Sequence, residues 1–234
     1  MKHLINLFLL LVPFVAVTAQ KSLEKGYVKM EITEATSEDP QMKMGLEMMK
    51  GSSTEIFFIK GKYKTSMNMM GGMIKMENVV DVDANKMDML MDAMGNKMWV
   101  DTDLDEAKKN KPAQQNMEDF KVEYDKASTK EILGYKAYKA TITMPNNAGM
   151  SVVGWVTEEI KTDANIIQGM EDLKLDGFPL EFSVVNPQMK LTFAATEIKE
   201  TVDESVFTLK TDGYKKMTMK EFTDTMGGMG AMGF

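Results

Sequence analysis

The amino-acid sequence predicts a mainly β fold with minor α content, built as one large domain or as two closely joined halves. Apolar and polar residues alternate with a period of two in segment after segment from Tyr27 onward. This is the pattern of strands that have one buried and one solvated face. Glycine- and asparagine-containing turns separate the segments. The 234 residues of the chain are enough to bury a substantial core.

Residues 1–19 form a segment of their own, which we interpret as a cleavable signal peptide. One lysine precedes an apolar run from Leu4 through Val17, and small residues follow it, as signal peptidase requires. Asn6 and Pro13 interrupt this run, whereas a helix that spans a bilayer needs about 20 unbroken apolar residues. The chain has no cysteine, so disulfides and a diacylated N-terminus are excluded. We therefore expect a periplasmic or secreted protein that is not a lipoprotein.

The composition excludes many kinds of active site. All 28 basic residues are lysines, and the only histidine, His3, lies in the expected signal peptide. Catalytic Ser-His-Asp and Cys-His arrangements, zinc sites of His or Cys, and arginine clamps cannot be built from such a chain. The net charge of −7 argues against nucleic acid and anionic lipid surfaces as partners. We expect no enzyme, no cofactor and no resident metal.

Strands of the first half follow one another closely. Apolar residues alternate with polar ones at Val28, Met30 and Ile32, and again from Met42 to Met48 after a loop at Ser37 to Pro40. A turn at Lys50 to Ser53 leads into a strand at residues 55–60. Each of these runs predicts a strand with an apolar inner face.

The next runs contain most of the methionines. Tyr63, Thr65, Met67 and Met69 share one face, after which Gly71 and Gly72 reverse the chain. The following strands have these apolar residues on one face: Ile74, Met76, Val80 and Val82, then Met87, Met89 and Met91, then Met98 and Val100. A polar segment at residues 101–117, interpreted as a loop or short helix, then joins the two halves.

The second half resumes the strand pattern at residues 120–124, 138–144, 151–158, 180–185 and 189–196. An amphipathic helix is predicted at Ala164–Leu173, with Asp163 as its cap. A second helix is predicted at Met217–Met226. The glycine-rich remainder, up to Phe234, is expected to hold no single conformation alone. The resulting division is residues 1–19, a domain at 20–216, and a C-terminal helix and tail at 217–234.

Twenty-six methionines and no cysteine indicate a bias for thioethers. Methionine is flexible and polarizable, so it suits an apolar surface that accepts varied shapes. An ordinary core that uses methionine as a gap-filler is the alternative. If the surface binds a ligand, the candidate residues are Met42, Met44, Met48, Tyr63, Met67, Met69, Met76, Met87, Met89, Met91 and Met98.

Several short motifs carry a family resemblance. They are the segments EILGYKAYK from Glu131, VGWVT from Val153, GFPL from Gly177, VF from Val206 and DGYKKM from Asp212. In this order they resemble an uncharacterised family of exported bacterial envelope proteins that is similar in fold to the LolA-type lipoprotein carriers. The resemblance implies a curved, incomplete antiparallel β-barrel, with helices over its open side and an apolar cavity for acyl chains. The chain departs from these carriers in having no arginine and in having Ala137 where relatives often have cysteine.

Other motifs give weaker functional hypotheses. Thioethers bind Cu(I) and Ag(I), so the cluster Met67, Met69, Met70 and Met73, or the tail from Met226, could hold such an ion. The segment from Asp81 to Asp92 opens like a calcium loop, but Lys86 replaces the required glycine, which favours an ordinary turn. Trp99 and Trp155 either line the mouth of the cavity or pack.

Three functions remain open at this stage. The first is an exported, non-catalytic envelope protein that binds a lipidic or hydrophobic molecule in a methionine-lined cavity. The second is a structural or interaction protein with a filled interior and an envelope protein as its partner. The third is a periplasmic buffer for Cu(I) or Ag(I).

Overall fold

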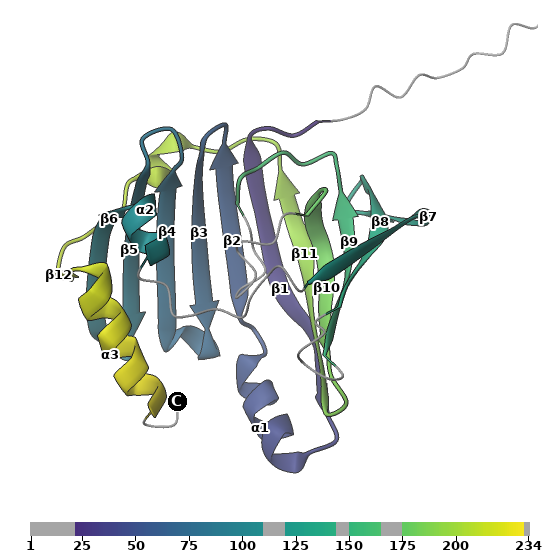
Figure 1. Cartoon of the computed structure of the whole chain (residues 1–234), viewed down its shortest axis with the longest axis horizontal. Helices are drawn as coiled ribbons and strands as arrows, with labels where there is room; N and C mark the ends of the chain where they lie inside the picture. Colours follow the sequence, from purple (N-terminus) through teal and green to yellow (C-terminus); the bar gives the residue numbers. More distant parts are fainter. Residues whose placement is uncertain (1–21, 110–119, 144–149, 165–174, 232–234) are drawn as a thin grey trace, which may run out of the picture.

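The computed structural model describes residues 22–109, 120–143, 150–164 and 175–231, with side chains up to Met226 in the last range. The expected signal peptide and residues 165–173 of the predicted helix lie outside these ranges. Within them the chain forms twelve strands and a few short helices (Figure 1). The mainly β fold with minor α content is therefore confirmed.

The first half contains six strands and two α-helices. Their bounds are β1 Gly26–Ser37, α1 Pro40–Met49, β2 Ser53–Ile59, β3 Lys62–Met69, η1 Met70–Gly72, β4 Ile74–Asp81, β5 Lys86–Ala93, β6 Asn96–Asp103 and α2 Leu104–Lys109. Apart from α1, these elements agree with the alternation in the sequence. Of the polar segment predicted at residues 101–117, residues 101–103 still belong to β6 and residues 104–109 form α2, while residues 110–117 lie outside the described ranges.

The second half contains the remaining six strands and the C-terminal helix. Their bounds are β7 Lys121–Ile132, β8 Tyr135–Thr143, β9 Ser151–Thr157, β10 Phe178–Val185, β11 Met189–Lys199, η3 Glu204–Phe207, β12 Lys215–Met217 and α3 Met219–Ala231. Strand β7 is longer than predicted because a bulge between Asp125 and Thr129 lets its pairing with β8 continue to Ile132.

All twelve strands belong to one sheet, in the order β12-β6-β5-β4-β3-β2-β1-β11-β10-β9-β8-β7. Every pair of neighbours is antiparallel except β12, which runs parallel to β6. The two halves meet in the centre, where β1 pairs with β2 on one side and with β11 on the other. The described residues thus form one continuous, open sheet.

The sheet curls at its β7 end, where β7 crosses in front of β10 (Figure 1). One core cluster includes buried residues of β1, β2, β8, β9, β10 and β11, and Val122 and Ile132 of β7 pack against it. Strands that are not neighbours in a sheet can share a core only if the sheet bends over itself. Phe58, Val28 and Leu180 are completely buried there, so this curl is the best-packed part of the fold. The curvature predicted from the family resemblance is confirmed.

The predicted strand at Met42–Met48 is wrong, because residues Pro40–Met49 form helix α1. Asp39 caps this helix, since its Oδ1 accepts hydrogen bonds from the backbone N–H of Gln41 (2.8 Å) and Met42 (3.1 Å). Pro40 occupies the first helical position, where its missing N–H costs nothing. Only Leu46 of α1 is buried. The alternation of methionine and polar residues there was therefore misleading, because the cap decides the local structure.

The C-terminal segment wraps around the edge of the sheet. Residues 200–214 lead from β11, in the middle of the sheet, to β12 at the edge beside β6. The chain then turns, and α3 lies across the face of β5 and β6 (Figure 1). The predicted Met217–Met226 helix begins two residues later than expected, because Met217 belongs to β12, and it continues to Ala231. Residues 226–231 of the expected flexible tail are therefore helical. In the described ranges, no helix has both the length and the apolar character needed to cross a membrane.

Candidate ligand-binding face

Four methionines stand opposite one another on four adjacent strands. Met67 of β3 pairs with Met76 of β4, Met76 pairs with Met91 of β5, and Met91 pairs with Met98 of β6. Directly paired residues of antiparallel strands project to the same side of the sheet, with Cβ atoms about 5 Å apart. These four residues therefore form a continuous row, the methionine row, on the face that also carries α2 and α3, which we call the inner face.

The rows on either side of the methionine row are also largely apolar. On one side lie Met69, Ile74 and Ala93, and on the other lie Thr65, Asn78, Met89 and Val100. One row further, Tyr63, Val80 and Met87 are paired. The inner face of β3 to β6 thus brings together eight of the eleven predicted binding residues, namely Tyr63, Met67, Met69, Met76, Met87, Met89, Met91 and Met98.

The other three predicted binding residues lie elsewhere. Met42, Met44 and Met48 belong to α1, where Met44 is 70% exposed and Met48 is 48% exposed. Their predicted place on the inner face of a strand is wrong, because Asp39 and Pro40 start a helix at this point. They are separate from the methionine row.

Helix α3 covers the β5–β6 end of the inner face. Met219 and Phe222 of α3 pack with Met89 and Val100, and Phe222 and Met226 pack with Met91 and Met98. The last two methionines are 6% and 4% exposed. This part of the predicted cavity is therefore filled by the protein's own side chains.

The β3–β4 end of the inner face is less well covered. Met67 and Met69 belong to neither of the two clusters beneath α3, and both are half-buried. Met76 and Ile74 are also half-buried, at the border of those clusters. The covered and the half-covered methionines form one uninterrupted surface, which ends beneath α3.

A buried amide oxygen lies in this surface. Asn78 is placed between Thr65 and Met89 on the inner face, and its Oδ1 is buried with no hydrogen-bond partner among the described residues. An unsatisfied buried acceptor costs about 1–3 kcal/mol. The inner face therefore contains one acceptor that a donor group could satisfy.

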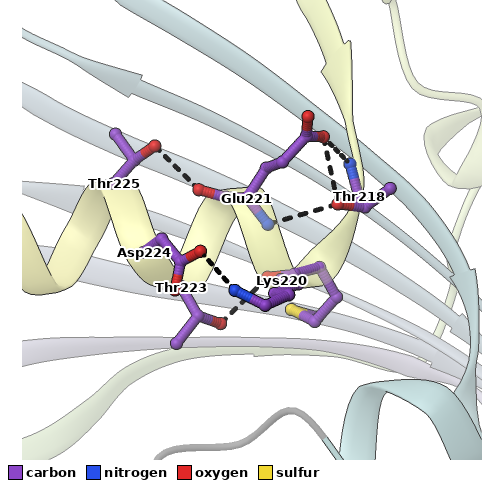
Figure 2. Close-up of polar contacts among 7 residues, drawn as sticks. Thr218, Lys220, Glu221, Thr223, Asp224 and Thr225 are labelled. Atoms are coloured by element: carbon purple, nitrogen blue, oxygen red, sulfur yellow. Dashed lines mark hydrogen bonds and ion pairs between the residues drawn. The ribbon is translucent and has the colours of Figure 1, made fainter.

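Helix α3 is held at its first turn by a capping box, shown in Figure 2. Thr218 Oγ1 accepts from the N–H of Glu221 (3.2 Å), while Glu221 Oε2 accepts from the N–H (2.8 Å) and the hydroxyl (3.0 Å) of Thr218. The hydrogen bond from the Thr218 backbone holds the pKa of Glu221 below its usual value. Lys216 adds an ion pair of 2.8 Å from β12 to Asp101 of β6, which lowers the pKa of Asp101.

The far end of α3 is weaker by composition. Residues 227, 228 and 230 are glycines, and each glycine inside a helix costs about 0.5–1 kcal/mol relative to alanine. The helix is thus fixed at its start by the cap and by β12, and it is weakest at its C-terminal end.

Both tryptophans lie on the outer face of the sheet. Trp99 pairs with Leu90 and Trp155 pairs with Lys139 and Glu181. Each ring has a lysine ammonium over it, Lys216 at 4.5 Å from Trp99 and Lys130 at 4.7 Å from Trp155. Cation–π contacts of this kind stabilise a surface, and neither ring lines the methionine row.

Two hollows have mixed polar and apolar linings, and Met67 is the one member of the methionine row among their lining residues. The larger, of 970 Å³, lies between the β2–β3 turn and residues 158–164 and includes Lys60, Lys126 and Glu158 in its lining. A smaller one of 600 Å³ lies on the outer face near Tyr214 and Lys210. Around the larger hollow, Glu158 pairs with Lys126 and accepts from Tyr138 Oη. These contacts tie β7 and β8 to the segment that follows β9.

The alternative ion sites can be placed in part. Met67 and Met69 project to the inner face, whereas Met70 and Met73 belong to the turn that follows β3, so the proposed sulfur cluster is divided between two places. In the calcium-like segment, Asp81 accepts from the N–H of Ala84 and pairs with Lys62 at 2.6 Å, as in an ordinary turn. The described residues contain no group of three or more His, Cys, Asp or Glu side chains placed to hold a metal ion.

Comparisons with known proteins give only distant similarities. No family model and no curated protein matches the chain. Among solved structures, the chain is similar to the lipoprotein LppX of Mycobacterium tuberculosis, with 12% identity, 77% of this chain and 89% of that chain covered, and a TM-score of 0.36. It is also similar to LprF of Mycobacterium bovis, with 12% identity, 79% and 89% covered, and a TM-score of 0.31.

A third similar structure is MucB, with 10% identity and a TM-score of 0.35 over 83% of this chain, which spans 60% of MucB. TM-scores of this size establish no family for the chain. The fold is therefore described from the structure of this chain alone. It is a single curved, open β-sheet with a methionine-rich inner face and short covering helices. The resemblance to LolA-type carriers remains a prediction.

Proposed function

We propose that this protein is a non-catalytic exported protein that binds an apolar or amphipathic molecule on the inner face of β3 to β6, with α3 as a displaceable cover. The observation that carries the proposal is the methionine row, Met67–Met76–Met91–Met98, which runs across four strands in register and is only partly covered. Methionine side chains can repack around guests of different shape at little cost.

Energetic considerations support such binding. An apolar molecule gains about 0.8 kcal/mol for each CH₂ group removed from water. Against this gain stands the cost of moving α3, whose C-terminal end is weakened by glycines. Binding of an alkyl chain is favourable when the free energy gained from its buried CH₂ groups exceeds the cost of displacing this end of α3.

The ligand is expected to carry a hydrogen-bond donor. Asn78 offers a buried acceptor between Thr65 and Met89, and a hydroxyl or amide group of the ligand would satisfy it. This favours an amphipathic molecule, such as a long-chain alcohol or a monoacylglycerol, over a pure hydrocarbon.

Native mass spectrometry of the protein purified from its host tests the proposal. We expect adducts of lipid mass, and uptake of monoacylglycerol by the delipidated protein. Met67→Asp places a charge in the methionine row at a half-buried position and should abolish uptake. Asn68→Asp, one residue further on the same strand and exposed on the other face, is the matched control. A clean apo mass with no uptake would leave the interaction protein with a filled interior as the better account.

A further inference from the structure

Exposed methionines gather at one end of the sheet. Four of them, Met44 and Met48 of α1, Met73 after β3 and Met94 after β5, are between 41% and 70% exposed. We call these four residues the methionine rim. Large apolar side chains in water are unfavourable, and a group of them at one end of a molecule marks a contact surface.

Backbone hydrogen bonds join the three segments of the rim into one structure. The N–H of Met94 donates to the carbonyl of Met73 (2.9 Å), which connects the two turns. The N–H of Met70 donates to Ser52 Oγ (3.3 Å). The N–H of Ser52, three residues after the end of α1, donates to the carbonyl of Met49 (3.0 Å). The rim is thus one surface with a fixed arrangement, and α1 lies at the same end of the sheet as the C-terminal end of α3 (Figure 1).

The backbone conformation at the rim is unusual for methionine. Met94 has φ of 53° and precedes Gly95, a pair that forms the tight turn between β5 and β6. Asparagine or glycine is normally found in this left-handed conformation, because other side chains are strained there. The β4–β5 turn places Asn85 in the same conformation. Methionine at position 94 therefore gives no benefit to the turn itself and presents a thioether to the outside.

The rim adjoins the proposed binding face. Ala93, which precedes Met94, belongs to a buried cluster against which Ile74, the residue after Met73, and Met226 of α3 both pack. A molecule that enters or leaves beneath the weak end of α3 passes the rim first.

The charges around the rim are balanced. Its segments, residues 38–50, 70–75 and 92–97, carry the following four lysines and four carboxylates: Lys43, Lys50, Lys75, Lys97, Glu38, Asp39, Glu47 and Asp92. The whole chain has a net charge of −7, so the excess of carboxylates lies elsewhere. A surface with no net charge and several exposed thioethers suits a bilayer interface of neutral lipids, where apolar insertion and not charge provides the affinity.

We infer that the methionine rim inserts into the surface of a neutral lipid bilayer and orients the open end of the inner face toward it. The proposed contact with the bilayer depends only on the residues of the methionine rim. The direction of ligand transfer that it implies rests on the proposed function.

Vesicle flotation tests the inference on the full chain with pure phosphatidylcholine vesicles. The triple variant Met44→Gln, Met48→Gln, Met94→Asn removes three thioethers at exposed positions, and asparagine suits the conformation at position 94. Leu133→Asn is the matched control, because Leu133 has φ of 51°, precedes Gly134 and is 48% exposed, but it lies in the β7–β8 turn at the opposite end of the sheet.

We expect the wild-type protein and Leu133→Asn to bind the phosphatidylcholine vesicles to the same extent, at low salt and at high salt. The triple variant should bind at least about tenfold more weakly, since each inserted CH₂ group contributes a factor of about four. Absence of wild-type binding, an equal loss in Leu133→Asn, or binding that requires anionic lipid would overturn the inference. So would a sedimentation experiment in which the rim pairs two copies of the chain and the triple variant separates them.

The two proposals fail separately. Uptake of monoacylglycerol from detergent-free solution reports on the inner face, and flotation reports on the rim. Uptake without flotation would remove only the rim inference, whereas flotation without uptake would remove only the proposed function.

Discussion

The two ends of the sheet are packed in different ways. Around β1, β2 and β8 to β11 most core residues are valine, isoleucine, leucine or phenylalanine, with Met30 as the one buried methionine of the cluster, and Val28, Ile56, Phe58 and Leu180 have no exposed surface. Around β3 to β6 methionine is the commonest residue on the corresponding face, which needs α2 and α3 to cover it. Branched and aromatic side chains hold fixed rotamers and define one packing, whereas methionine adapts. The comparison indicates a rigid half that supports a deformable half.

Phe58→Ala should have the largest effect on this comparison. It removes a fully buried ring from the rigid core, and such changes cost about 3–5 kcal/mol of unfolding free energy. Urea denaturation followed by circular dichroism measures the loss. A cost below about 1 kcal/mol would contradict the view that this end of the sheet is the rigid one.

Removal of residues 218–234 should have the next largest effect. Without α3, Met89, Met91 and Met98 lose their cover, and the burial of Phe222 and Met219 is lost, at a cost of about 2–3 kcal/mol. We expect the strands to remain folded, with strong binding of an apolar fluorescent dye to the uncovered methionine row. Unchanged dye fluorescence at equal protein concentration would refute α3 as the cover.

Asn78→Leu should stabilise the protein by about 1 kcal/mol, because it removes an acceptor that is buried without a partner. The same change should weaken the binding of a long-chain alcohol relative to an alkane of equal length. Thermal unfolding gives the first value and competition for dye binding gives the second. If the affinity for the alcohol relative to the alkane is the same in the wild type and in the variant, Asn78 plays no part in recognition.

Met91→Leu should change the unfolding free energy by less than about 1.5 kcal/mol, since the two side chains have similar volumes. The expected consequence is functional, because leucine is less flexible than methionine. The range of ligand sizes accepted by the inner face should narrow. Met91→Leu with an unchanged range would indicate that the methionines act as ordinary core residues.

Acid should loosen α3 without unfolding the sheet. The pKa values of Glu221 and Asp101 are lowered in the folded protein, by the Thr218 backbone and by Lys216 respectively. Their contributions are therefore complete above the unfolded pKa values of about 4 and are lost as the pH falls through the lowered folded values. Amide hydrogen exchange of α3 should increase below about pH 4. Glu221→Gln should reduce this dependence, and an α3 that is equally protected at both pH values would contradict it.

Much of the sheet could be predicted from local sequence. The alternation around Tyr63–Met69 and Phe120–Tyr124, together with the turns at Gly71 and Asn85, located most strands because each strand places alternate side chains on opposite faces. Helix α1 was missed, since Met42, Met44, Leu46 and Met48 also alternate. The local signal that identifies α1 is the pair Asp39–Pro40, a helix cap followed by a favoured first residue.

The amino-acid sequence by itself determined the mainly β fold, the sorting of methionines to one face of successive strands, and the exclusion of sites that need histidine, cysteine or arginine from the described chain. Strand register, the continuous methionine row and the position of α3 were decided only by the tertiary structure. The physical reason is that alternation fixes which face a side chain takes within its own strand, but the partner opposite it depends on pairings between distant parts of the chain. The joining of β1 to β11, some 160 residues apart, and the return of the C-terminus to β6 are set by the packing of the whole chain.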